Sequence, residues 1–150
     1  ICVPGEYAAY TFFQAMAPRF SGTLWARIGF LHGLARKVSA GRGMFRTPSK
    51  SEPCGLAQMV ALRYGTVPIV RGTGGLKDTI TDSGDGKGNG FTFASYNAYD
   101  MQAACLRAKE GHEDTEGWNM LIRRAMECDY SWGASARKYL AMYKEVDALW

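Results

Sequence analysis

The residues best suited to chemistry lie in the segment 48–56, where Glu52 stands before a turn of Pro53, Cys54 and Gly55 that opens directly into a predicted helix. The free N–H groups and the dipole of a helix's first turn favour an anion such as a phosphate. Gly55 would let that anion approach the backbone closely. Glu52 is a hydrogen-bond acceptor that suits sugar hydroxyls. The alternative, that Glu52 is simply a favourable acid near a helix start, is equally open.

A second segment, residues 71–79, follows a predicted buried strand and precedes a possible short helix. Its glycines Gly72, Gly74 and Gly75 fall within four residues, which fits either a phosphate-binding nest or a close-packed turn. The spacing is neither GxGxxG nor a Walker A loop, so dinucleotide-binding and P-loop sites are disfavoured. The two interpretations of the glycine turn stay open.

Phe30 follows Ile28 and Gly29 at the end of another predicted strand. An aromatic side chain at such a strand end can stack on a nucleobase. From spacing alone, the favoured explanation is that Phe30 is an ordinary core residue.

The composition excludes several other kinds of site. The four cysteines are irregularly spaced without a CxxC pair, and with two histidines no zinc site is expected. The loop 84–90, near Asp82 and Asp85, lacks EF-hand spacing and is interpreted as a flexible, hairpin-like connection rather than a calcium site. The net charge of +4 is spread without a basic run, so no nucleic-acid partner is expected. With no apolar run long enough for a membrane span and no signal-peptide pattern, we expect a cytoplasmic protein without a membrane partner.

Strands and helices alternate along the chain until about residue 93, after which the pattern is helical. Strands are predicted at 24–29, 44–47, 67–70 and 91–93, with a possible stub at 1–3. Helices are predicted at 7–17, 31–40, 56–64, 99–109, from 115 and from 131. Gly65 is expected to end the helix 56–64, and either Ser95 or Asn97 to cap the helix 99–109. This order predicts an α/β fold, a Rossmann-like parallel sheet of about five strands covered on both faces, with a helical C-terminal tail. Ligands of such sheets bind beyond the carboxyl ends of the strands.

Taken together, the loops resemble those of bacterial glycogen (starch) synthases of the ADP-glucose type. The matching segments are 48–56, 63–71, 73–79, 90–93 and 129–132. Three long motifs in the same order and spacing make the resemblance specific, and a weaker similarity extends over the whole chain.

The resemblance implies the C-terminal half of a GT-B glycosyltransferase, in which two Rossmann-like domains face a cleft. It implies transfer of glucose from ADP-glucose to the non-reducing end of an α-1,4-glucan, with retention at the anomeric carbon and with no metal or other cofactor. In that comparison Glu52 is the catalytic-site carboxylate that holds the donor glucose. The implied donor-binding residues are Cys54, Gly55 and Leu56 at the distal phosphate, Phe30 stacked on adenine, and Gly74 and Gly75 in a turn lining the same pocket.

In the family, the acceptor-binding domain and the Arg and Lys that grip the diphosphate precede the part that this chain matches. Residues 1–150 are therefore expected to be a single, N-terminally truncated nucleotide-sugar-binding domain that meets the glucan only through the missing domain. Alone, they are expected to transfer no glucose. The alternatives are a non-catalytic module that binds ADP or ADP-glucose, and an inert folded fragment. The sequence leaves the choice between ADP and UDP open.

Overall fold

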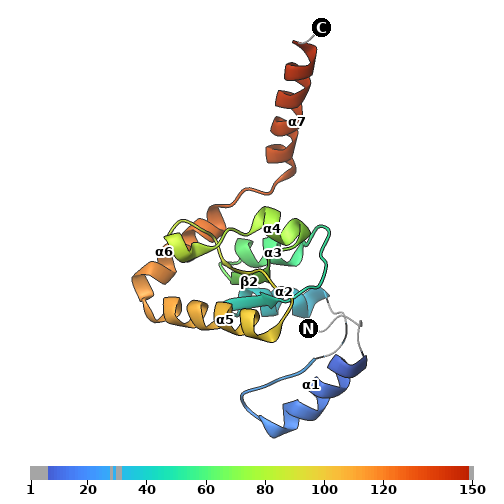
Figure 1. Cartoon of the computed structure of the whole chain (residues 1–150), viewed down its shortest axis with the longest axis vertical. Coiled ribbons are helices and arrows are strands. Elements are labelled where there is room, and N and C mark those ends of the chain that lie inside the picture. Colours follow the sequence, from blue (N-terminus) through green and yellow to red (C-terminus); the bar gives the residue numbers. More distant parts are fainter. Residues whose placement is uncertain (1–6, 28, 30–31, 149–150) are drawn as a thin grey trace. The chain divides into compact units, whose positions relative to one another are not determined.

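The computed structural model describes residues 7–27, 29 and 32–148, which fall into two compact units, 1–41 and 42–150. In the first unit the described elements are helices α1 (Tyr7–Arg19) and α2 (His32–Ala40) (Figure 1). The strand expected at 24–29 is wrong for its described part, because residues 24–27 have no regular structure. The N–H groups of Thr23 and Leu24 both bond to the carbonyl of Phe20 in a turn. An alternating pattern alone does not make a strand where no neighbouring strand pairs with it.

The second unit holds a parallel sheet of three strands in the order β1-β2-β3: β1 (Met44–Thr47), β2 (Val67–Arg71) and β3 (Phe91–Phe93). Met44 lies opposite Val67, and Ile69 lies opposite Phe91. The predicted parallel α/β sheet is confirmed. Its described part has three strands rather than about five, since residues 24–27 are not a strand and the predicted stub at 1–3 lies outside the described residues.

The helices and the short 3-10 turn of this unit are α3 (Ala57–Arg63), α4 (Gly74–Thr79), η1 (Ser83–Asp85), α5 (Ala98–Glu113), α6 (Thr115–Glu127) and α7 (Trp132–Asp147). The three long helices begin at polar caps. Asn97, Asp114 and Ser131 each accept a hydrogen bond from the backbone N–H three residues further on. Such caps satisfy N–H groups that have no partner within the helix. Of the two candidate caps, Ser95 and Asn97, the structure uses Asn97, and the predicted helix start at Ser131 is confirmed.

Helix α3 ends at a glycine, as the sequence predicts. Gly65 has φ +71°, and its N–H bonds to the carbonyl of Leu62 at 3.0 Å. The N–H of Thr66 bonds to the carbonyl of Ala61 at 2.9 Å. This pair of bonds is the Schellman ending of a helix, which needs the left-handed conformation that glycine adopts without strain. It turns the chain directly into β2.

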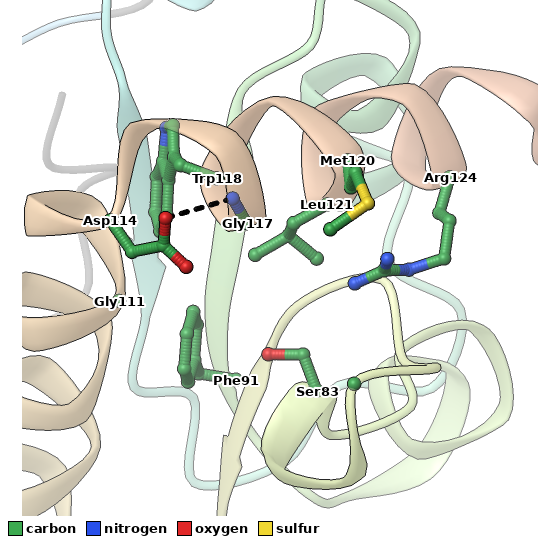
Figure 2. A pocket seen from close by; sticks show the side chains of 10 residues that line it. Ser83, Phe91, Gly111, Asp114, Gly117, Trp118, Met120, Leu121 and Arg124 are labelled. Atoms are coloured by element: carbon green, nitrogen blue, oxygen red, sulfur yellow. Dashed lines mark hydrogen bonds between the residues drawn. The ribbon is translucent and has the colours of Figure 1, made fainter.

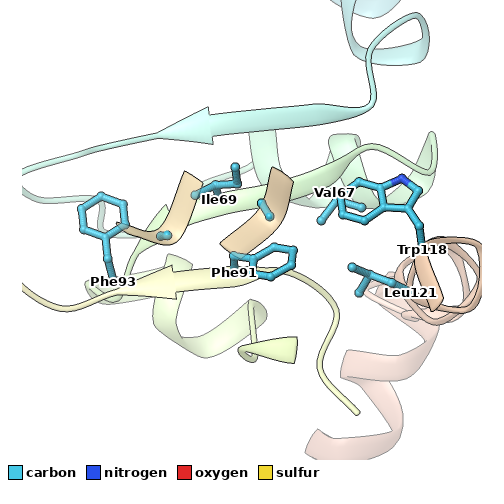
Figure 3. Close-up of a cluster of buried hydrophobic side chains, with 8 residues drawn as sticks. Val67, Ile69, Phe91, Phe93, Trp118 and Leu121 are labelled. Atoms are coloured by element: carbon cyan, nitrogen blue, oxygen red, sulfur yellow. The ribbon is translucent and has the colours of Figure 1, made fainter. Parts of the chain in front are cut away.

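One face of the sheet is covered by α5 and α6. Figure 3 shows the side chains of Val67 and Ile69 from β2 with those of Phe91 and Phe93 from β3, and with Trp118 among the residues that α6 contributes. Ala104 and Ala108 of α5 and Leu121 of α6 complete this buried cluster. The rings of Phe91 and Trp118 are stacked with their centres 6.4 Å apart.

The opposite face is covered by α3 and α4, which lie across β2 from α5 in Figure 1. Val70 of β2 points to this side and packs with Leu62 of α3, Leu76 of α4, Ile80, and Ala125 of α6. Because alternate residues of a strand face opposite sides, the apolar run of β2 fills both clusters. The predicted two-sided covering of the sheet is confirmed.

Helix α7 differs from the other α-helices of the second unit, since none of its described residues is buried. Trp132 at its start is 88% exposed. No helix among the described residues is long and apolar enough to cross a membrane.

Candidate functional site

The two predicted glycine-containing loops meet beyond the carboxyl ends of β1 and β2. The N–H of Gly75 donates to the backbone carbonyl of Glu52 at 3.0 Å. A Cβ at Gly74 would overlap the carbonyl of Glu52, and one at Gly75 would overlap the carbonyl of Cys54. The two segments therefore pack backbone to backbone. Of the two interpretations of the glycine turn, the close-packed one describes Gly75, whose N–H is already engaged by the protein.

The start of α3 lies next to this contact. Gly55 has φ +70°, and a Cβ there would come 2.6 Å from Oε1 of the buried Gln58. Leu56 caps α3 through its backbone alone, with no side-chain hydrogen bond to the first turn among the described residues. Cys54 and Leu56 are exposed and Glu52 is half-buried. The expected phosphate position at this helix start stays a prediction.

The structure adds Arg71, the last residue of β2, which sequence analysis did not single out. Its Nη1 donates to the carbonyl of Lys50 at 2.7 Å and its Nε donates to the carbonyl of Ala94 at 3.1 Å. Its guanidinium carbon lies 5.8 Å from the centre of the Tyr96 ring. Hydrogen bonds from a charged group are the stronger kind. Arg71 thus ties the segment before Glu52 to the segment after β3, and its place at the carboxyl end of a buried strand is the signal that could have identified it.

A cavity of about 300 Å³ opens at the same edge of the sheet. It is lined by Pro48 after β1, Phe93 at the end of β3, and Tyr96, Asn97, Ala98 and Met101. Its walls are mainly apolar, and the Tyr96 side chain is exposed. The carboxyl edge of this sheet therefore has both a backbone-lined helix start and an apolar hollow, which is the usual place and character of a ligand site in α/β proteins.

A second cavity, of about 230 Å³, lies at the amino end of β3, beside Ser83 and Phe91 (Figure 2). The two charged side chains of its lining are engaged within the protein. Asp114 accepts from the N–H of Gly117 at 3.1 Å, and Arg124 donates to the carbonyl of Gly88 at 3.0 Å. We assign it no function because it lies away from the carboxyl edge.

The expected aromatic position Phe30 lies outside the described residues.

The interpretation of the loop 84–90 as a hairpin-like connection is wrong, because Asp82 and Gly90 at its two ends form a parallel bridge. Asp82 is bound there by Arg107 at 2.7 Å and by the N–H of Thr92 at 2.6 Å. In the part of the chain that the structure describes, no three His, Cys, Asp or Glu side chains are grouped to hold a metal ion.

Asp82 makes folding sensitive to acid. Burial alone would raise its pKa, but hydrogen bonds from Arg107, Thr92 and Gly84 lower it to about 2, from an ordinary value of 3.8. A carboxyl with a lowered pKa in the folded state stabilises that state above its unfolded pKa, and the stabilisation is lost as pH falls through the folded pKa. The affected window is therefore about pH 4 to 2.

We expect the free energy of unfolding of the unaltered chain to exceed that of Asp82→Asn at pH 6. The difference between the two free energies of unfolding should be smaller by about 1 kcal/mol at about pH 2.5 than at pH 6. This value allows for the partial exposure of the Asp82–Arg107 pair, which weakens its interaction. Urea unfolding at the two pH values measures it. Asp85→Asn, which removes a carboxylate from the same loop but leaves the Asp82–Arg107 pair in place, is the control variant. A constant difference between Asp82→Asn and the unaltered chain would contradict the assignment.

The chain is similar to curated glycogen synthases. It is 46% identical to the glycogen synthase of Anoxybacillus flavithermus over 146 residues, which are 96% of this chain and 30% of that protein. It is 47% identical to a glycogen synthase of Bacillus cereus over 144 residues, with 95% and 30% covered. No protein-family model matches the chain.

Among solved structures, it is similar to the catalytic domain of starch synthase IV from Arabidopsis thaliana, bound to ADP and acarbose. The TM-score is 0.80 with 34% identity over 90% of this chain and 29% of that one. Sucrose-phosphate synthase from Thermosynechococcus elongatus, with a TM-score of 0.67 and 19% identity over 95% and 35% of the two chains, shares the fold alone.

These matches confirm the resemblance that the loops suggest. The helix-covered parallel sheet and the helical C-terminal region are those of the Rossmann-like α/β fold of GT-B glycosyltransferases. The chain spans about 30% of the length of the curated relatives it matches. It is therefore a homologue of one part of the bacterial glycogen (starch) synthases.

Proposed function

We propose that this chain is the donor-binding part of a retaining glucosyltransferase that moves glucose from ADP-glucose to an α-1,4-glucan. One observation carries the proposal: the Glu52 loop and the glycine turn lock together at the carboxyl edge of the sheet in a chain 46% identical to a glycogen synthase. Ligands of open α/β sheets bind at that edge.

The roles within the proposal follow from what each group offers. The half-buried carboxylate of Glu52 accepts hydrogen bonds from the donor glucose hydroxyls. The first-turn N–H groups beside Cys54, Gly55 and Leu56 bind the distal phosphate. Negative charge grows on the departing diphosphate during transfer, so donors fixed in advance lower the barrier, and losing one typically costs about 3–4 kcal/mol. Phe30 would stack on the adenine.

ADP is favoured over UDP as the carried nucleotide because the solved starch synthase, 34% identical, is bound to ADP. That the acceptor is a glucan is proposed because the relatives are named glycogen synthase, and this chain spans about 30% of their length. A cytoplasmic location is also part of the proposal, and is supported by the unpaired state of all three described cysteines.

Titration calorimetry with ADP-glucose, ADP and glucose tests donor binding directly. The expected dissociation constant for ADP-glucose is tighter than about 1 mM, which corresponds to about −4 kcal/mol. Absence of binding by the folded chain would overturn the proposal. These 150 residues alone are expected to add no glucose to glycogen above a blank without protein.

Replacing Glu52 by glutamine should weaken ADP-glucose binding roughly tenfold, since hydrogen bonds to a charged acceptor contribute about 1.5–3 kcal/mol. ADP lacks the glucose, so its affinity should not change. Glu113→Gln, an exposed glutamate at the end of α5, is the matched control. If Glu52→Gln leaves the preference for ADP-glucose over ADP intact, Glu52 does not hold the sugar.

A non-catalytic module that binds ADP or ADP-glucose is the second candidate. The observation that favours it is the apolar cavity of about 300 Å³ at the carboxyl edge of the sheet, which offers room for a nucleotide and needs no transfer step. Turnover of ADP-glucose onto glycogen would exclude this candidate, whereas loss of all nucleotide binding would leave an inert folded fragment.

A further inference from the structure

Gln58 is a polar side chain in an unexpected place. It is 1% exposed, in the first turn of α3, directly after the predicted phosphate position. Its Nε2 donates to the hydroxyl of Thr79 at 3.0 Å, at the far end of α4. A buried amide is costly unless it is hydrogen-bonded, so its presence calls for a physical reason.

The Thr79 hydroxyl continues the connection. It donates to the carbonyl of Gly75 at 2.6 Å, which leaves its oxygen to accept from Gln58. The N–H of the same Gly75 donates to the carbonyl of Glu52. These bonds close a circuit, since Glu52 and Gln58 belong to one short stretch of chain. That stretch is fastened to α4 at both ends.

The stretch between the two fastenings carries the candidate site. Cys54 and Leu56 in it are exposed, and the side chain of Leu56, the N-cap residue, makes no hydrogen bond to the first turn that follows. Gly55 is seated against the Gln58 amide, where a Cβ would come 2.6 Å from Oε1. The position of the helix start relative to Glu52 therefore depends on Gln58 and its partner.

We infer that Gln58 and Thr79 are positioning residues that hold the segment 52–58 against α4 in the geometry that binds a nucleoside-diphosphate sugar. The functional part of this inference rests on the proposed function. Neither side chain touches the donor in this role. Each acts through the backbone that it fixes, Gln58 at the start of α3 and Thr79 at Gly75.

The test compares Thr79→Val, which keeps the size and removes the hydroxyl, with Thr79→Ser, which keeps the hydroxyl. Amide hydrogen exchange reports local opening. In Thr79→Val the Gly75 amide should exchange at least roughly tenfold faster, while the Val70 amide in β2 is unchanged. Thr79→Ser should restore the slow exchange. A purely global loss of stability would accelerate both amides together, and that result would overturn the inference.

Titration with ADP-glucose gives the functional result. Thr79→Val should weaken binding at least roughly fivefold and Thr79→Ser should restore it. A folded Thr79→Val chain with unchanged Gly75 exchange or unchanged affinity would overturn the inference. If the unaltered chain binds no ADP-glucose, the proposed function fails, and the exchange data still decide whether the circuit positions the segment. If Thr79→Val does not fold, Gln58→Met, which removes the donor and keeps the side-chain length, is measured in the same way.

Discussion

Replacing Gly75 by alanine is expected to destabilise the chain by about 3 kcal/mol and to abolish ADP-glucose binding. The new Cβ would overlap the backbone carbonyl of Cys54. A flexible side chain could move aside, but this neighbour is backbone, so either the Glu52 loop or α4 must shift. The shift would also break the bond from the Gly75 N–H to the Glu52 carbonyl. Urea unfolding and titration calorimetry measure the two effects.

Gly72→Ala is the matched control in the same segment. A Cβ at Gly72 would meet the carbonyl oxygen of Phe93 at 3.7 Å, an ordinary contact. Its expected cost is below about 0.5 kcal/mol. Equal losses of stability for Gly72→Ala and Gly75→Ala would show that the close approach of the two loops is not what requires glycine.

Truncating Trp118 to alanine is expected to lower the free energy of unfolding by about 3–5 kcal/mol. Trp118 is 7% exposed, lies 6.4 Å from the Phe91 ring and meets the His112 ring edge-on at 5.0 Å. Its removal would leave a cavity between α6 and the sheet. A loss of this size is a large fraction of the roughly 5–15 kcal/mol by which an ordinary domain is stable. Circular dichroism during urea unfolding measures the change.

Trp132→Ala removes the same side chain from a position that is 88% exposed, at the start of α7. We expect it to change the free energy of unfolding by less than about 0.5 kcal/mol. Comparing Trp118→Ala with Trp132→Ala therefore separates the effect of burial from the effect of removing a tryptophan. A larger loss for Trp132→Ala than for Trp118→Ala would mean that α7 rather than α6 supports the core.

The sequence by itself determined the strands at 44–47 and 91–93, most of β2, and the helix start at Ser131. It narrowed the cap of α5 to Ser95 or Asn97, of which the structure uses Asn97. The residue sequences of its loops also indicated the similarity to glycogen and starch synthases. These features are local. An apolar run, a capping side chain or the glycine that ends α3 acts on residues within a few positions of itself, so its effect can be predicted without knowing the rest of the fold.

Only the tertiary structure decided which patterns find partners. Residues 24–27 have the alternating pattern of a strand, yet no strand among the described residues pairs with them. The sequence allowed two interpretations of the turn at Gly75. The contact of Gly75 with the Glu52 loop shows that the turn is close-packed. Gln58 and Arg71 look like surface residues in the sequence, but one is buried against Thr79 and the other joins Lys50 to Ala94. The physical reason is common to all: burial and hydrogen bonding join residues about 20 positions apart, and no local propensity encodes them.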